Sequence, residues 1–310
     1  MTSRPGFALV AALWLVVALT AAGLDIGLHS RAQRLAIANT LESTRARAAA
    51  EAGIEHVRAR LSHALRQNDA RLQLDAWAVL DDLLTDTTAL REARYHIAIR
   101  DPSARVHLDR ADEEQLRRLL RVLRVDFGEA DRIAQAVTDW RDADDLRRPR
   151  GAERDDYLRD GSPLLPRNAP FGSVEELSFV RGMTPELFAR VAPHLTQHGN
   201  GLVNLNRAPE PVLLSLPGFT PEAAAVVRRV TAGGGELRRM QELLDAVPPV
   251  ARQAVQSNMD GLLRRVTFET REIEVVSEGW VDGSPVRALA TAVISWGGSS
   301  VVAGWRRVES

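Results

Sequence analysis

The apolar run Phe7-Ala-Leu-Val-Ala-Ala-Leu-Trp-Leu-Val-Val-Ala-Leu-Thr-Ala-Ala-Gly-Leu24 opens the chain and decides what kind of fold can follow. Roughly 20 helical residues cross the hydrocarbon core of a bilayer, so the run predicts a membrane-spanning helix. Arg4 precedes the run and Asp25 follows it, which orients the short N-terminus toward the cytoplasm and the rest of the chain outward. We therefore expect an exported protein held by one N-terminal helix.

A short basic leader, Met1-Thr-Ser-Arg-Pro5, precedes Gly6 and Phe7. This arrangement resembles the leader of type IV pilin-like proteins. The resemblance implies that a prepilin peptidase cuts after Gly6, that Phe7 becomes N-methylated, and that the apolar helix stays on the mature protein. Gly suits this position because it has no side chain to block a scissile bond at the membrane surface. An ordinary secretory signal, cut near Thr20-Ala21-Ala22, is the alternative.

Ala11 departs from the pilin-like pattern, in which the fifth residue after the cut is usually a Glu that pairs with the free amine of a neighbouring subunit. A carboxylate in hydrocarbon is costly unless it is paired. The absence of that carboxylate therefore indicates a subunit without a neighbour in that direction, which is the situation at the tip of a filament.

Composition narrows the chemistry of the chain. Its 310 residues predict two compact units, or one with a large insertion. Lys plus Arg number 40 and Asp plus Glu 41, so there is no overall attraction to nucleic acid or acidic lipid. The absence of Cys excludes disulfides, thiolate nucleophiles and cysteine-ligated metals. Because the sequence also lacks the common hydrolase, metalloprotease and phosphate-loop patterns, we expect no enzymatic activity.

The membrane helix is predicted to continue beyond the bilayer. Between Ser30 and Gln67 there is no Pro and a single Gly, Gly53, and apolar residues recur at steps of three and four. The small-residue patch Ala48-Ala-Ala-Glu-Ala-Gly53 permits close packing of this helix on another element.

The middle of the chain contains an internal repeat. Val106-His-Leu-Asp-Arg-Ala-Asp-Glu-Glu-Gln-Leu116 and Val203-Asn-Leu-Asn-Arg-Ala-Pro-Glu-Pro-Val-Leu213 agree at six of eleven positions, with an offset of 97. Helical patterns follow each copy. A second correspondence, between Glu175-Glu-Leu177 and Gln241-Glu-Leu243, has an offset of 66. The difference predicts an insertion of about 30 residues in the first copy, roughly over residues 141–170.

These helical units resemble helix-hairpin-helix modules of the SAM-like type, which often bind duplex phosphates through a Gly-rich hairpin. The second hairpin, Gly218-Phe-Thr220, lacks the second Gly, and the first carries Asp126 where a phosphate would lie. We expect no nucleic-acid partner and prefer a scaffold for protein contacts, with a membrane-anchored DNA-binding module as the alternative.

The insertion is dense in charge. Between Asp139 and Asp160 eight carboxylates accompany six arginines, with no His. Six to eight oxygen ligands are what a hard cation such as calcium requires. The segment is not an EF-hand, because Arg147 stands where that loop needs Gly. A surface loop with weak internal ion pairs is the alternative.

A specific family resemblance rests on Asp139-Trp-Arg-Asp-Ala-Asp-Asp145, Gly151-Ala-Glu153 and Asp155-Asp-Tyr157. Together with the leader, Ala11 and the Leu205-Asn-Arg-Ala-Pro209 motif, these segments resemble the K-class minor pseudopilins of type II secretion (the GspK family). Members of this family bind calcium in the helical domain. The resemblance implies the following candidate calcium ligands: Asp142, Asp144, Asp145, Glu153, Asp155 and Asp156.

Strand patterns bracket the helical repeat. Tyr95 to Val106 alternates in polarity, and residues 266–308 read as strands with a tight turn at Asp282-Gly283. The expected fold class is therefore α+β: a pilin-like long N-terminal helix on an antiparallel sheet, with an inserted all-helical SAM-like or helix-hairpin-helix-type domain. The expected limits are a leader (1–6), a transmembrane part (7–28), pilin-body helix and first strands (29–108), an inserted helical domain with the acidic calcium loop (109–200), a second helical module (201–265) and the C-terminal strands (266–310).

The resemblance also implies a function. We expect a single-pass inner-membrane protein, with most of the chain in the periplasm, that caps or initiates a pseudopilus during protein secretion. Its expected partners are the I- and J-class minor pseudopilins, the major pseudopilin filament and the prepilin peptidase. A minor pilin of a type IV pilus is the closest alternative.

Overall fold

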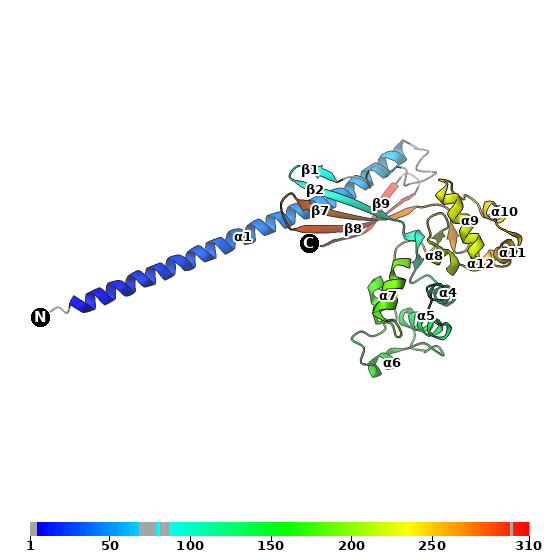
Figure 1. Cartoon of the computed structure of the whole chain (residues 1–310), viewed down its shortest axis with the longest axis horizontal. Helices are drawn as coiled ribbons and strands as arrows, with labels where there is room; N and C mark the ends of the chain where they lie inside the picture. The colour runs from blue at the N-terminus through cyan, green and yellow to red at the C-terminus, as the bar shows by residue number, and fades with distance from the viewer. Residues whose placement is uncertain (1–4, 68–78, 81–82, 84–86, 298–299, 310) are drawn as a thin grey trace.

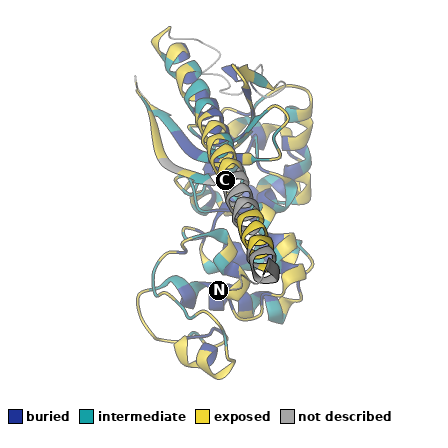
Figure 2. Ribbon diagram, turned by 90° about the vertical axis from the view of Figure 1, so that its left-hand side faces the viewer, coloured by how far each residue is buried: buried dark blue, intermediate teal, exposed yellow. Residues whose placement is uncertain are grey.

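The computed structural model describes residues 5–67, 79–80, 83, 87–297 and 300–309, and for residues 5–9, 11, 21–32, 35, 305, 306 and 309 it describes the backbone alone. Helix α1 (Pro5–Arg66) dominates its shape. The first half of α1 projects away from the rest of the protein, and the second half lies against a sheet (Figure 1). Described side chains in the projecting half are exposed, as Figure 2 shows in yellow.

The sheet has five antiparallel strands in the order β1-β2-β7-β8-β9. These strands are β1 (Thr88–Leu90), β2 (Ala93–Arg100), β7 (Glu272–Val281), β8 (Arg287–Gly297) and β9 (Ser300–Glu309). The turn predicted at Asp282-Gly283 is confirmed: it joins β7 to β8, with Gly283 at a φ of 80°. Alternate residues of β7, such as Ile273 and Val275, are buried against α1 in one hydrophobic core.

Small residues allow α1 to approach the sheet closely. Ala46, Ala49, Ala50 and Gly53 of α1 are all buried. A Cβ atom on Gly279 of β7 would come within 2.3 Å of the Ala46 carbonyl oxygen. This explains the small-residue patch in physical terms, because no larger side chain fits between the two backbones.

A helical domain is inserted between β2 and β7. It contains η2 (Pro102–Ala104), β3 (Val106–His107), α4 (Glu113–Val122), α5 (Phe127–Arg141), α6 (Arg154–Arg159), η3 (Val174–Phe179), α7 (Pro185–Val191), η4 (Ala192–His194), β4 (Leu195–Thr196), β5 (Val203–Asn204), α8 (Glu210–Ser215), α9 (Pro221–Ala232), α10 (Met240–Ala246), α11 (Pro249–Ser257), α12 (Met259–Leu263) and β6 (Val266–Thr267). The two predicted modules within it share a single hydrophobic core, separate from that of the sheet.

The internal repeat is visible as a structural duplication. Each copy begins with a two-residue strand, β3 or β5, and these strands start 97 residues apart, as the aligned motifs do. Each strand pairs in parallel with a strand that closes its module, β4 or β6. The segment between α5 and η3, which contains α6, corresponds to the predicted insertion.

Equivalent residues form hydrogen bonds between the two halves of each copy. Asn206 is buried; its side-chain oxygen accepts the Leu237 N–H at 2.8 Å, and its amide donates to the carbonyls of Leu237 and Phe268. In the first copy the equivalent residue is Asp109, which accepts the Phe171 N–H at 2.9 Å. The repeated motif is therefore a local clamp.

A long helix on an antiparallel sheet with a helical insert confirms the expected α+β class.

Candidate metal centre

Aromatic packing positions the acidic segment. Trp140, in the last turn of α5, is buried; its ring packs edge-on against Tyr157 of α6 at 5.2 Å between centroids and stacks on Phe171 at 6.1 Å. These contacts fix the end of α5 relative to α6. Asp142, the first residue after α5, is thereby held near the start of α6.

Asp139 and Arg148 form an ion pair within the segment, with the Asp139 carboxylate buried. Asp139 is fully buried; its carboxylate accepts a hydrogen bond from Arg148 Nη1 at 2.6 Å and from the Arg148 backbone N–H at 3.2 Å. Arg148 also pairs with Asp142. A Cβ on Gly151 would come within 1.9 Å of Asp139 Oδ2, so the bare backbone at Gly151 makes room for this carboxylate.

Glu153 is the most unusual group in the segment. Its side chain is buried, and both carboxylate oxygens lack a hydrogen-bond partner among the described residues. Burial, and then the negative charges of Asp139 and Asp142, raise the pKa of Glu153 to about 7, with further contributions from Asp145 and Asp144. Glu153 and these four aspartates thus gather negative charge in one region. The guanidinium of Arg148, which pairs with Asp139 and Asp142, offsets only part of it.

Two of the candidate ligands, Asp144 and Asp145, lie on the outside of this region. The Asp144 side chain accepts the Leu146 N–H at 2.8 Å. Asn168 donates to the Asp144 carbonyl oxygen at 3.1 Å and to Asp145 Oδ1 at 2.8 Å. Both aspartates are exposed, so a conformational adjustment of this loop would not disturb the core.

Asp156 and Asp155 do not join this region. The Asp156 carboxylate lies within 3.5 Å of three guanidinium groups, those of Arg147, Arg159 and Arg181. Burial opposes ionisation of Asp156, but the Glu153 N–H and these arginines outweigh it and lower its pKa. Its charge is already compensated, and Asp155 is exposed on α6. The two residues therefore lie apart from the other four candidates, and their binding of calcium stays a prediction.

The structure thus brings together four of the six candidates, Asp142, Asp144, Asp145 and Glu153, and adds Asp139. Asp139 lies in the last turn of α5, three residues before Asp142, the residue that caps this helix, and this spacing was available in the sequence. In the conformation described, no three His, Asp or Glu side chains among the described residues are arranged to hold a metal ion. Both carboxylate oxygens of Glu153 and Oδ1 of Asp142 nevertheless lack a hydrogen-bond partner among the described residues. Carboxylate oxygens are the ligands that calcium prefers.

The predicted processing residues lie at the start of α1. Gly6 and Phe7 are helical. The side chains of Phe7 and Ala11, and residues 1–4 of the leader, lie outside what is described. Within the described part of the chain, no helix combines the length and the apolar character that crossing a membrane requires.

The hairpin between α8 and α9 bears on the nucleic-acid alternative. A Cβ on Gly218 would lie 2.5 Å from the Ala254 carbonyl oxygen of α11. Its missing side chain therefore serves packing within the module. That no nucleic acid binds stays a prediction.

A long helix packed on one face of an antiparallel sheet defines the class of pilin-like subunits. Residues 88–198 match the family model described as protein K of the type II secretion system. No curated protein matches the chain. Among solved structures, it is similar to a chain in the crystal structure of the GspK-GspI-GspJ complex from the type 2 secretion system of enterotoxigenic Escherichia coli. The similarity has a TM-score of 0.69 at 17% identity and covers 91% of this chain and 99% of that chain.

The family match and the shared fold together support assignment of the chain to the K-class (GspK) minor pseudopilins of type II secretion. This assignment implies a membrane-associated periplasmic protein that is a component of a secretion machine.

Proposed function

We propose that this chain occupies the tip of a periplasmic pseudopilus, where it caps or initiates the filament during protein secretion across the outer membrane. The observation that carries the proposal is the position of the helical domain, which extends beyond the sheet at the end of the molecule opposite the N-terminus (Figure 1). In a filament whose subunits stack along their α1 helices, so large a domain would clash with the next subunit above it. At the end of the filament it has room.

The projecting half of α1 supports a single-pass inner-membrane anchor. Its described large apolar side chains between Val10 and Leu19 are exposed, for example Leu13 at 61% and Trp14 at 68%. Water would oppose such exposure over so many apolar residues, whereas hydrocarbon would not. Mass spectrometry of the mature protein tests the anchor: an N-terminal methylated Phe7 is expected, and a terminus near Ala22 would indicate ordinary secretion instead.

The expected partners are the I- and J-class minor pseudopilins and, below them, the major pseudopilin. The similar chain described above was crystallised in a complex with GspI and GspJ, and the exposed, partly apolar surface of α1 offers a shared contact. Co-purification of the full chain in detergent with its I- and J-class counterparts should yield one complex. If the chain elutes alone while the two others remain associated, the tip role fails.

We further propose that the acidic segment binds calcium through Asp139, Asp142, Asp144, Asp145 and Glu153. Bound calcium would supply positive charge to buried carboxylates and so hold the loop between α5 and α6 in one conformation. The unpartnered Glu153 supports this proposal. Millimolar calcium should raise the melting temperature of the full chain in detergent, with magnesium and a chelator as controls. If melting is indifferent to calcium, the segment is a surface loop.

The proposed role is structural, without catalysis. The K family to which the chain is assigned consists of components of the secretion machine, which supports this reading.

A further inference from the structure

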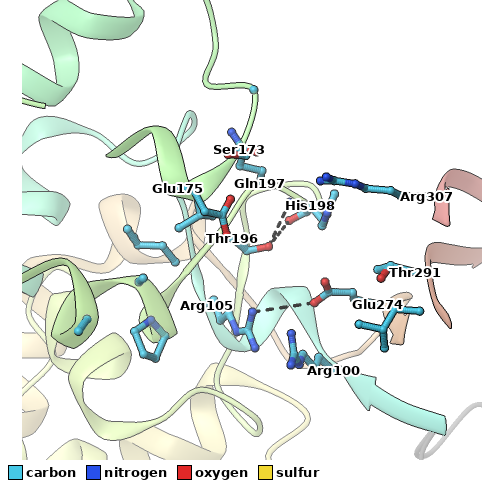
Figure 3. Close-up of a pocket in the computed structure, with 17 residues that line it drawn as sticks. Arg100, Arg105, Ser173, Glu175, Thr196, Gln197, His198, Glu274, Thr291 and Arg307 are labelled. Carbon is cyan, nitrogen blue, oxygen red and sulfur yellow. Dashed lines mark hydrogen bonds and ion pairs between the residues drawn. The ribbon is translucent and has the colours of Figure 1, made fainter. Parts of the chain in front are cut away.

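A cleft of about 680 Å³ lies between the sheet and the helical domain (Figure 3). One wall is the face of the sheet opposite α1, with side chains from β2, β7, β8 and β9. The other wall is formed by residues 172–175 and 189–198 of the helical domain. Its volume falls within the range of roughly 300–1,000 Å³ typical of ligand sites. Neither the calcium proposal nor the tip proposal uses this cleft.

Positive charge exceeds negative charge at one end of the cleft. Arg100 of β2 and Glu274 of β7 are cross-strand neighbours, and Arg105 Nη1 lies 3.9 Å from Glu274 Oε2. Two guanidinium groups therefore lie near one carboxylate, and only that of Arg105 pairs with it. Arg100 has no hydrogen bond or ion pair from its side chain to any residue within the described ranges. Figure 3 shows Arg100 and Arg105 on either side of a short gap beside Glu274.

The two arginines influence each other. Burial lowers the pKa of Arg105; Glu274 acts to raise it, and the nearby charge of Arg100 lowers it further. Arg307 of β9 adds positive charge to the same lining. Glu175 lies on the opposite wall but is exposed, so solvent screens its charge more than that of the half-buried Arg105. An incoming carboxylate would relieve the repulsion between Arg100 and Arg105.

An apolar patch lies further along the same cleft: Leu289 is four residues along β8 from Val293, the cross-strand partner of Glu274. Leu289 of β8 is 43% exposed and lines the cleft together with Ala192 and Pro193 of the helical domain. A small inorganic anion would pair with the arginines and leave this patch uncovered. An extended peptide with an acidic residue and an apolar residue a few positions away would contact both.

We propose that the cleft binds a short extended segment of another protein, with a carboxylate held by Arg100 and Arg105 and an apolar side chain, a few residues along the segment, on Leu289. The occupant is thus an acidic peptide and not a free anion. This assigns a binding site to the junction between the sheet and the helical domain.

The test uses the full chain in detergent micelles and two pools of fluorescein-labelled octapeptides, whose fixed fourth residue is Glu in one pool and Gln in the other, flanked by Ala, Leu, Val and Ser. Fluorescence anisotropy should show at least tenfold tighter binding of the Glu pool. Arg100→Ala should weaken that binding about tenfold. Glu274→Gln should strengthen it, because the competing internal carboxylate is gone, and a gain cannot come from misfolding.

Arg94→Ala provides the matched control. Arg94 lies on the same strand and the same face but pairs with Asp282 at 2.9 Å, outside the cleft, so its removal should leave peptide affinity unchanged. Equal affinity for the two pools, no measurable binding of either, or indifference to Arg100→Ala would overturn the proposal. Displacement of the peptide by an equal concentration of inorganic phosphate would also overturn it, since the cleft would then be a simple anion site.

Discussion

At the scale of single residues, the proposed calcium site depends on the buried carboxylates of the acidic segment. Glu153 has two unpartnered oxygens, and Asp139 next to it is held by one arginine. Burial of a charge without a partner costs free energy, so these residues are expected to destabilise the protein unless a cation compensates them. The segment should therefore behave differently with and without calcium.

Glu153→Gln tests this behaviour in two opposite directions. The folded-state pKa of Glu153 is about 7, above the ordinary 4.5, so the folded state binds a proton more tightly than the unfolded state. Stability of the metal-free protein should therefore fall as pH rises from about 4.5 through 7. At pH 8 without metal, Glu153→Gln should be more stable than the wild type by about 1–3 kcal/mol.

With calcium the order should reverse, because calcium stabilises only the protein that binds it. Thermal melting at pH 8, with and without calcium, measures both effects. Asp155→Asn is the matched control, since it removes an exposed carboxylate of the same helix and should leave the calcium response intact. If Asp155→Asn abolishes the response and Glu153→Gln does not, the ligand set described above is wrong.

Part of this site was predictable from the sequence. Carboxylate density and the resemblance pointed to this segment, and four of the six candidates share a region of it. The exceptions have a physical reason: Asp156 faces three arginines, of which Arg181 is distant in sequence. Spacing along the chain does not reveal such tertiary partners.

At the scale of elements, the packing of α1 on the sheet requires contact between two backbones. Gly279→Ala should destabilise the protein by about 1–3 kcal/mol, because the new methyl group would collide with the backbone of α1 at Ala46 and Ala50. Gly304→Ala in β9, where a Cβ meets nothing within 4 Å, is the control and should change the melting temperature little. Equal effects of the two substitutions would argue against the close contact.

The clamp formed by Asn206 gives a second prediction at this scale. Asn206→Asp keeps the acceptor for the Leu237 N–H but removes the donor to the carbonyls of Leu237 and Phe268. A buried charge also replaces a neutral amide, so the loss should be about 2–4 kcal/mol. Asn200→Asp, on the exposed loop before β5, should cost less than about 0.5 kcal/mol. Thermal melting at pH 7 compares them; similar melting temperatures would contradict the clamp.

The elements themselves were largely predictable. The motif repeat at an offset of 97 anticipated the paired start of β3 and β5, and Asp282-Gly283 anticipated the hairpin. What the sequence did not reveal is that the two helical modules share one core, and that β3 and β5 pair in parallel with strands that follow much later. Two-residue strands carry no periodicity, so pattern alone cannot detect them.

At the scale of the whole molecule, three parts follow one another along the long axis: an exposed apolar helix, a sheet, and a helical domain (Figure 1). This order puts the proposed membrane anchor at one end and the helical insertion at the other. This shape, together with Ala11 in place of the usual Glu, is the basis of the proposed tip position, in which the subunit has neighbours only below it.

The most direct test of the tip position is to label filaments. The chain, with an epitope tag after Ser310, would be produced together with the other pseudopilins at levels that give long pseudopili, and gold-labelled antibody would be located by electron microscopy. The account predicts label at one end of each filament and none along its length. Regular labelling along the shaft would contradict it.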